Sequence, residues 1–216
     1  MNSRDTILHR IRTALADRPE VPLPPACEVW PRENPDTNTM LDRFEKELTD
    51  VSGEMIRCGS LDDARAKLSQ LMDAESWSTL ASVDKPAAHA LLDAMPSEKI
   101  AWSRPNWEAP TLADVPAGLV VADTLLADTG SCVVACGTAQ ERLLCYLPPT
   151  CIVLAKADQL AEHLPAAWDD LAQRAADEST RGEFVIITGP SRTADIEKIL
   201  ILGVHGPKRL VVLLIE

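Results

Sequence analysis

The sequence predicts an α/β fold in which a mostly parallel sheet is sandwiched by helices. Short apolar runs alternate with amphipathic segments from residue 53 to the end of the chain, and this alternation is typical of a parallel sheet with crossover helices. The length of 216 residues fits one α/β domain with an N-terminal appendage, or two small domains. A hydrophobic fraction of 46% is enough for a full-sized core.

The N-terminal segment is expected to stand apart from that domain. Residues 3–17 have a broken helical apolar period, formed by Ile7, Leu8, Ile11 and Leu15. This predicts an amphipathic helix that packs on the domain or on a partner, and the segment lacks the continuous apolar core of a signal peptide. Residues 18–38 contain six prolines, which predicts an extended linker. We therefore assign residues 1–38 to a helical and Pro-rich arm and residues 39–216 to the α/β domain.

The elements of that domain follow in order along the chain. Helices are expected at 39–50, 61–74, 86–95, 157–177 and 194–202. Strands are expected at 53–58, 78–83, 98–102, 119–127, 131–136, 150–155, 183–188 and 209–215. The Pro- and Trp-containing segment 103–117 is expected to be a loop. Asp128-Thr129-Gly130 separates two of the apolar runs like a hairpin turn, so one antiparallel pair is expected within 119–136.

Charge and composition exclude several classes of function. The net charge of −12 argues against a nucleic-acid surface, which needs basic residues, and against binding to anionic membranes. No apolar run reaches the roughly 18 residues of a membrane span. There is no GxGxxG motif, which argues against an autonomous dehydrogenase with a bound dinucleotide. The sequence therefore predicts a cytoplasmic protein with no cofactor, no membrane insertion and no nucleic-acid partner.

The six cysteines give no metal-binding signal, because no CxxC pair is present. On a strand, Cys132 and Cys136 would share one face about 13 Å apart, which is too far for one metal ion. We therefore expect buried, reduced thiols and no metal site, and a purified protein that is colourless and poor in metal.

The turn Asp128-Thr129-Gly130 is the first candidate site. Asp128 follows an apolar strand, where its carboxylate could act as a catalytic acid or contact a ligand. The alternative is that Asp128 closes a tight turn by bonding its own backbone, with Gly130 at positive φ.

The segment ITGPSRTADIE (187–197) is the second candidate site. Gly189 to Thr193 would lie between a strand and a helix, where backbone N–H groups and the helix dipole can bind an anion. Arg192 would add a bidentate donor for carboxylate or phosphate. The alternative is that Pro190 shapes the turn and that Ser191 or Thr193 caps the helix.

Two expectations concern how the loops are placed. Arg192 and Asp128 should share one edge of the sheet and line one cavity, because ligands of open α/β sheets bind at the carboxyl ends of strands. A helix over 194–202 would be about 13 Å long and would hold the SRT and VHG loops at opposite ends. His205 is therefore expected to lie away from that cavity within one chain, unless a subunit contact brings it there. Arg142 is expected to pair with a substrate carboxylate or with a nearby acid.

Four motifs occur in order in the C-terminal half: ADTGS (127–131), RLLCYLPP (142–149), ITGPSRTADIE (187–197) and GVHGP (203–207). Together they resemble the LUD domain family, formerly a domain of unknown function, and within it the lactate-utilisation proteins. The resemblance covers 119–216 by motif and the rest by layout. It implies a fold similar to the sugar-phosphate isomerase and CoA-transferase-like group.

The resemblance also implies a role in oxidising L-lactate to pyruvate beside two iron–sulfur partner proteins, which would carry the clusters. This chain would then be a subunit of an oxidoreductase system that binds a small organic anion or a partner's redox surface. The alternatives are a stand-alone transferase or isomerase acting on a phosphorylated or CoA-linked molecule, and a scaffold subunit without chemistry. The sequence leaves open whether the protein forms a homo-oligomer.

Two departures from the family pattern bear on catalysis. The family has Glu where this chain has Asp128, and Ser where this chain has Cys145. The shorter Asp side chain withdraws the carboxylate by about 1 Å, which weakens a role as covalent nucleophile because reacting atoms need near-contact placement.

Overall fold

The computed structural model describes residues 3–16, 30–104, 107–178, 183–193 and 201–216. The chain divides into two compact units, 1–31 and 32–216. The first unit contains helix α1 (Ser3–Ala16), none of whose residues is buried. Its exposed Ile7, Ile11 and Leu15 form the apolar stripe that the sequence predicts. The second unit contains all other elements.

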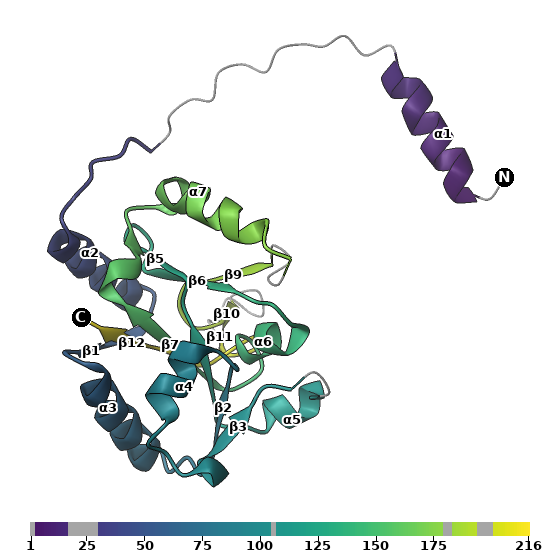
Figure 1. The fold of residues 1–216 in the computed structure, drawn as a ribbon. Coiled ribbons are helices and arrows are strands. Elements are labelled where there is room, and N and C mark those ends of the chain that lie inside the picture. The colour runs from purple at the N-terminus through teal and green to yellow at the C-terminus, as the bar shows by residue number, and fades with distance from the viewer. Residues whose placement is uncertain (1–2, 17–29, 105–106, 179–182, 194–200) are drawn as a thin grey trace. The chain divides into compact units, whose positions relative to one another are not determined.

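A six-stranded sheet forms the centre of the second unit. Its strand order is β1-β12-β7-β4-β2-β3, and every neighbouring pair is parallel. The strands are β1 (Glu54–Cys58), β2 (Leu80–Ser82), β3 (Ile100–Trp102), β4 (Ala117–Val121), β7 (Thr150–Lys156) and β12 (Arg209–Ile215). The mostly parallel sheet flanked by helices is thereby confirmed (Figure 1).

A second, four-stranded sheet has the order β8-β5-β6-β9. Its strands are β5 (Thr124–Leu126), β6 (Ser131–Ala135), β8 (Leu160–Ala161) and β9 (Phe184–Ile187). The single strand expected at 119–127 is wrong, because it is divided between β4 and β5, which lie in different sheets. The break is at Asp123, whose carboxylate accepts the N–H of Ala135 at 2.7 Å. The antiparallel pair expected within 119–136 is β5 and β6.

The second unit contains helices α2 (Thr37–Asp50), α3 (Leu61–Ala74), α4 (Pro86–Leu92), α5 (Ala109–Ala113), α6 (Ala139–Leu144) and α7 (Leu164–Ala175), with 3-10 turns η1 (Ser97–Lys99) and η2 (Ala157–Gln159). Four helices lie where the sequence predicts them, α3 with the same limits and α2, α4 and α7 with shifted ends, whereas α5 and α6 were not expected. Two expectations are wrong in part. The segment 157–177 begins with η2 and β8 before α7, and the expected loop 103–117 contains α5.

Helix α2 shows why the sequence folds as it does locally. The Asp36 side chain accepts the N–H of Thr39 and so caps the first turn. Leu41, Phe44 and Leu48 recur at helical spacing and are buried. The helix packs on β1 and also on β8, so it touches both sheets. It ends before Ser52, which has a φ of 67°.

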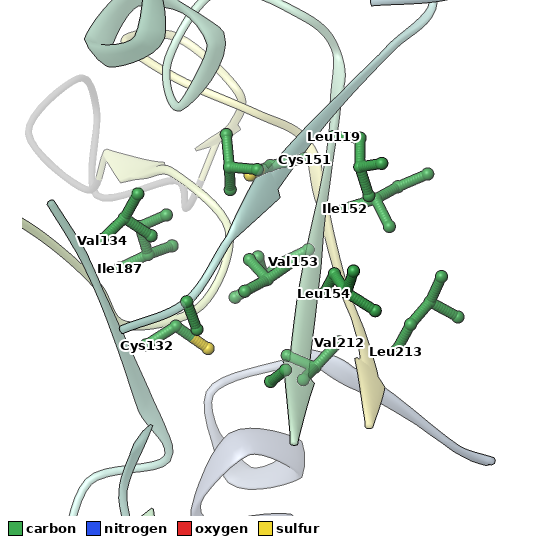
Figure 2. Close-up of a cluster of buried hydrophobic side chains, with 14 of the residues drawn as sticks. Leu119, Cys132, Val134, Cys151, Ile152, Val153, Leu154, Ile187, Val212 and Leu213 are labelled. Carbon is green, nitrogen blue, oxygen red and sulfur yellow. The ribbon is translucent and has the colours of Figure 1, made fainter. Parts of the chain in front are cut away.

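The main core lies between the two sheets and extends through the six-stranded sheet to its other face. Along β7, side chains alternate, and Figure 2 shows Val153 on the side of Cys132 while Leu154 points the other way. Val153 pairs in register with Val212, and Leu154 with Leu213, so both strands have the same alternation. All four residues are at most 3% exposed. Apolar residues on both faces explain why these strands are continuous apolar runs in the sequence.

A two-stranded sheet lies between β9 and β12 in the sequence. Its strands, β10 (Arg192–Thr193) and β11 (Ile201–Leu202), pair antiparallel with Arg192 opposite Leu202, and we call this sheet the hairpin β10–β11. The helix expected over 194–202 is therefore wrong at its end; residues 194–200 lie outside the described residues. Across the described ranges, no helix has the length and apolar character needed to cross a bilayer.

Candidate functional site

The turn Asp128-Thr129-Gly130 joins β5 to β6 and packs on helix α2. Gly130 has a φ of 61°, which is in the left-handed region that favours glycine. A Cβ atom on Gly130 would lie only 2.2 Å from the backbone nitrogen of Leu48. The turn therefore needs glycine both for its backbone conformation and for its close approach to α2.

The loop after β9 approaches the same end of α2. Gly189 has a φ of 78°, and a Cβ atom there would lie 2.7 Å from the carbonyl oxygen of Val51. Val51 directly follows α2. Both candidate loops thus pack against the C-terminal end of α2.

A chain of hydroxyl groups links the two loops. Ser131 Oγ lies 2.8 Å from Thr129 Oγ1 and 2.7 Å from Thr188 Oγ1. Thr129 Oγ1 in turn lies 3.3 Å from Asp128 Oδ1. A carboxylate only accepts hydrogen bonds, so Thr129 donates to Asp128, Ser131 donates to Thr129, and Thr188 donates to Ser131. The proton of Thr188 is thereby used inside the protein, while Thr188 as a residue is exposed.

Ser191 connects the second candidate loop to the GVHGP segment. Its N–H donates to Pro207 O at 2.8 Å, and its hydroxyl accepts the N–H of His205 at 3.4 Å. Ser191 therefore neither caps a helix nor offers its N–H to an anion. Residues Arg192 and Thr193 continue as β10. A helix that begins at Ser191 is therefore excluded, and the alternative cap, Thr193, directly precedes residues 194–200, which lie outside the described residues.

The expectation that the SRT and VHG loops lie at opposite ends of one helix is also wrong. Gly203 N–H donates to Ser191 O at 2.9 Å, which places the loops side by side within one chain. That expectation required β9 and β12 to be consecutive strands of one sheet, but they belong to different sheets. No βαβ crossover forms between them, and the hairpin β10–β11 brings the loops together instead. The side chain of His205 is exposed there.

The RLLCYLPP motif contacts the segment that follows GVHGP. The N–H groups of Lys208 and Arg209 lie 2.8 and 3.2 Å from Pro149 O, at the end of RLLCYLPP. Contacts therefore run without a gap from the Asp128 turn through Thr188 and Ser191 to the GVHGP loop and Pro149. We call this set, formed by residues 127–131, 188–193, 203–208 and Pro149, the motif edge. It lies where β7 and β12 begin, which is the amino edge of the six-stranded sheet.

Arg192 is an exposed basic residue of the motif edge. Its Nη2 donates to Ser52 Oγ at 2.5 Å, just beyond α2. Strands β5 and β9 both run antiparallel to β6 and both end beside Ser131, so Asp128 and Thr188 follow strands that end at one edge of the four-stranded sheet. The cavity expected between Arg192 and Asp128 stays a prediction. In the described structure the guanidinium of Arg192 bonds Ser52 and forms no ion pair with Asp128.

Arg142 lies away from the motif edge. Its guanidinium forms an ion pair with Glu183, directly before β9, whereas Thr188 directly follows that strand. A four-residue strand separates the two ends by about 13 Å. Of the two partners considered for Arg142, the structure thus provides the nearby acid.

The cysteines of the described structure are buried and form no disulfide: Cys58, Cys132, Cys136, Cys145 and Cys151; Cys27 lies outside the described residues. Burial raises the pKa of Cys132 and raises the pKa of Cys151 to about 12. A hydrogen bond with the thiol of Cys136 raises the pKa of Cys145, as does burial, and the same bond lowers the pKa of Cys136. No cluster of three or more His, Cys, Asp or Glu in the described ranges could hold a metal ion.

Three residues of the site escape sequence reasoning. Ser52 and Glu162 belong to no motif, and the hydroxyl of Thr188 was passed over within ITGPSRT. The carboxylate of Glu162 accepts the N–H groups of Glu33 and Asn34 at 3.0 and 3.3 Å. Its carbonyl accepts the N–H of Asp128 at 3.1 Å. Glu162 therefore ties residues 33–34, which the sequence assigns to the arm, to the backbone of the Asp128 turn.

The fold and the motif edge together define a class of protein: a parallel α/β domain with a second, mixed sheet and a polar, hydroxyl-rich edge built from C-terminal motif loops. The LUD domain model matches residues 41–215, and the chain belongs to the LUD domain family.

Individual relatives agree with this membership. The chain is 25% identical over 231 residues to a protein of Halalkalibacterium halodurans named lactate utilization protein C, a match that covers 99% of this chain and 97% of that one. A protein of the same name from Bacillus pumilus is 36% identical over 99 residues, which is 45% of this chain and 41% of the relative. The crystal structure of a DUF162 family protein from Deinococcus radiodurans has a TM-score of 0.63 at 17% identity. It covers 84% of this chain and 99% of that one, and shows the shared fold.

Proposed function

We propose that this protein is a component of a lactate-utilisation system and supports the oxidation of L-lactate to pyruvate together with iron–sulfur partner proteins. The names of the relatives support the pathway. In this proposal the partners carry the electron-transfer clusters, and this chain contributes a binding surface in the cytoplasm.

The observation that carries the proposal is the chemistry of the motif edge. Thr188 presents an oxygen whose own proton is used by Ser131, so it can accept a hydrogen bond from a ligand hydroxyl. Arg192, four residues along the chain, presents an exposed guanidinium suited to a carboxylate. A 2-hydroxy acid such as lactate carries both groups on adjacent carbons. We propose that Arg192 binds its carboxylate and Thr188 its hydroxyl.

Asp128 has a supporting role in this arrangement. Its negative charge is stabilised by the hydroxyl of Thr129 and fixes the direction of the whole hydroxyl chain. The Asp128 carboxylate accepts the hydroxyl of Thr129 within the turn, so its position is fixed by a neighbouring residue. The neighbouring His205 loop is held by Ser191 and widens the surface on which a partner protein can dock.

The proposal is tested by growth on L-lactate as the carbon source. We expect a strain that lacks this protein to fail, wild-type protein to restore growth, and Arg192→Ala to restore little. The matched control is Arg43→Ala, which removes an exposed arginine of α2 outside the motif edge and should restore growth fully. Copurification of iron–sulfur proteins with the tagged chain tests the partners. Normal growth of the deletion strain on lactate would show that the proposal is wrong.

A further inference from the structure

A concave region lies at the edge of the six-stranded sheet opposite the motif edge, where the parallel strands end. A pocket of about 280 Å³ is formed there between helices α3 and α4 and the ends of β4, β7 and β12. Its walls are mainly apolar and include Leu61, Ala87, Val121, Leu154 and Ile215. The carboxyl edge of an open parallel sheet is the usual position of a ligand site in α/β proteins.

This apolar pocket adjoins a wider polar cleft. The cleft has a volume of about 570 Å³ and shares Ala87, Lys156 and Gln159 with the pocket. Its further walls include Asp123, Asp158 and Arg174. The shared residues mark the junction between the apolar interior and the polar entrance, so a ligand with two chemically different ends would fit the pair of cavities.

The charges at the junction narrow the class of ligand. Arg174 is already paired with Asp123 and Asp170. The amide of Gln159 is also used, since it donates to Ala122 O at 2.7 Å and accepts the N–H of Lys156 at 2.7 Å. Lys156 is exposed, and no carboxylate of the described residues forms an ion pair with it. Asp123, Asp158 and Asp170 also line this cleft, and Arg174 already pairs with two of them. The Lys156 ammonium can therefore balance one negative charge, whereas the three carboxylates would repel a phosphate with two.

We propose that the pocket and the cleft form one binding site for a small monocarboxylate with an apolar body. The hydrocarbon part occupies the pocket between α3 and α4, and the carboxylate lies at the junction beside the Lys156 ammonium. Lactate has only a methyl group to bury and fills little of the pocket, so this site prefers larger monocarboxylates. The site lies at the carboxyl edge of the six-stranded sheet and the motif edge lies at its amino edge, so this proposal does not rest on the proposed function.

Calorimetric titration of the full-length protein with butyrate, pentanoate, hexanoate and benzoate tests the proposal. Each methylene buried between butyrate and hexanoate should tighten the Kd about fourfold. Hexanamide, which has the same body without the charge, should bind at least about tenfold more weakly than hexanoate. L-Lactate should compete poorly for this site.

Four variants separate the site from its alternatives. Lys156→Gln should weaken hexanoate binding at least about tenfold, whereas Lys46→Gln, which changes net charge equally on α2, should not. Ala87→Leu should fill the pocket and block binding of hexanoate. Arg192→Ala should leave hexanoate binding unchanged, which distinguishes this site from the motif edge. Absence of binding by every carboxylate, equal affinity along the series, or unchanged binding by Lys156→Gln would overturn the proposal.

Discussion

The hydroxyl oxygen of Ser131 lies 2.7 Å from that of Thr188, across 57 residues of sequence. This contact joins the end of β9 to the start of β6 and so unites two motif loops. Ser131 is buried and Thr188 is exposed. The chain of hydroxyl groups that begins at the Asp128 carboxylate thus passes through Thr129 and Ser131 and ends at Thr188, an exposed residue.

Replacement of Thr188 by Val tests this relay. Val keeps the shape of Thr but removes the oxygen, so lactate-dependent growth should fall strongly. Since Thr188 is exposed, the free energy of unfolding should change by less than about 1 kcal/mol, even though Ser131 loses one donor. Urea denaturation measures this stability.

Thr188→Ser is the matched control for this experiment. Ser retains the hydroxyl that donates to Ser131 and should restore growth to near the wild-type level. Growth of Thr188→Val equal to that of Thr188→Ser would show that the oxygen has no functional role.

Gly130→Ala should be strongly destabilising. The new Cβ would meet the backbone of Leu48 at 2.2 Å, and the φ of 61° is unfavourable for alanine. Left-handed strain and overpacking together predict a loss of about 2–5 kcal/mol in the free energy of unfolding. Chemical denaturation followed by circular dichroism measures it.

Gly59→Ala provides the comparison. No atom lies within 4 Å of a Cβ atom built on Gly59, so its stability should stay within about 0.5 kcal/mol of wild type. If both variants lost the same stability, close packing of the Asp128 turn on α2 would not be the cause.

The sequence predicts best those elements whose periodicity is local. Leu41, Phe44 and Leu48 repeat at helical spacing, and the structure contains α2 there. The apolar run 209–215 becomes β12, with its limits unchanged. In both cases the apolar pattern that predicts the element lies within one short segment, so the element can be predicted without knowing which distant residues pack against it.

The placement of the motif loops depends on distant partners and could not be predicted in this way. Nothing near Phe184–Ile187 indicates that β9 pairs with β6 rather than with β12. Pairing with β6 and pairing with β12 would both need the same apolar run in β9. Once β9 was assigned to the wrong sheet, the geometry of the following segment led to the wrong position for His205. Shared hydrogen bonds of Ser191, rather than any local pattern, set that position.

The hydroxyl of Ser191 should therefore stabilise the position of the GVHGP loop more than the imidazole of His205 does. Ser191→Ala removes the hydroxyl that accepts the N–H of His205, so hydrogen exchange of that amide should become faster. His205→Ala leaves this backbone bond in place, and its exposed side chain should contribute less than about 0.5 kcal/mol to stability.

Hydrogen exchange read by NMR, together with thermal unfolding, compares the two variants. A larger loss of stability in His205→Ala than in Ser191→Ala would contradict this assignment. It would indicate that the ring itself holds the loop.

Stability should fall in alkaline solution because of the buried thiols. Burial raises the pKa of Cys151 to about 12, whereas an unfolded cysteine has a pKa of about 8.5. The native state thus keeps a proton that the unfolded state releases. This contribution is fully present below about pH 8.5 and is lost as the pH rises through about 12. Urea midpoints measured between about pH 8 and pH 11 should decrease.

Cys151→Ala should reduce this decrease, because it removes one thiol with a raised pKa and leaves the other titrating groups unchanged. Its small cavity lowers stability at every pH, so the slope with pH, not the absolute midpoint, is the readout. Equal slopes in the two proteins would show that ionisation of Cys151 is not coupled to unfolding.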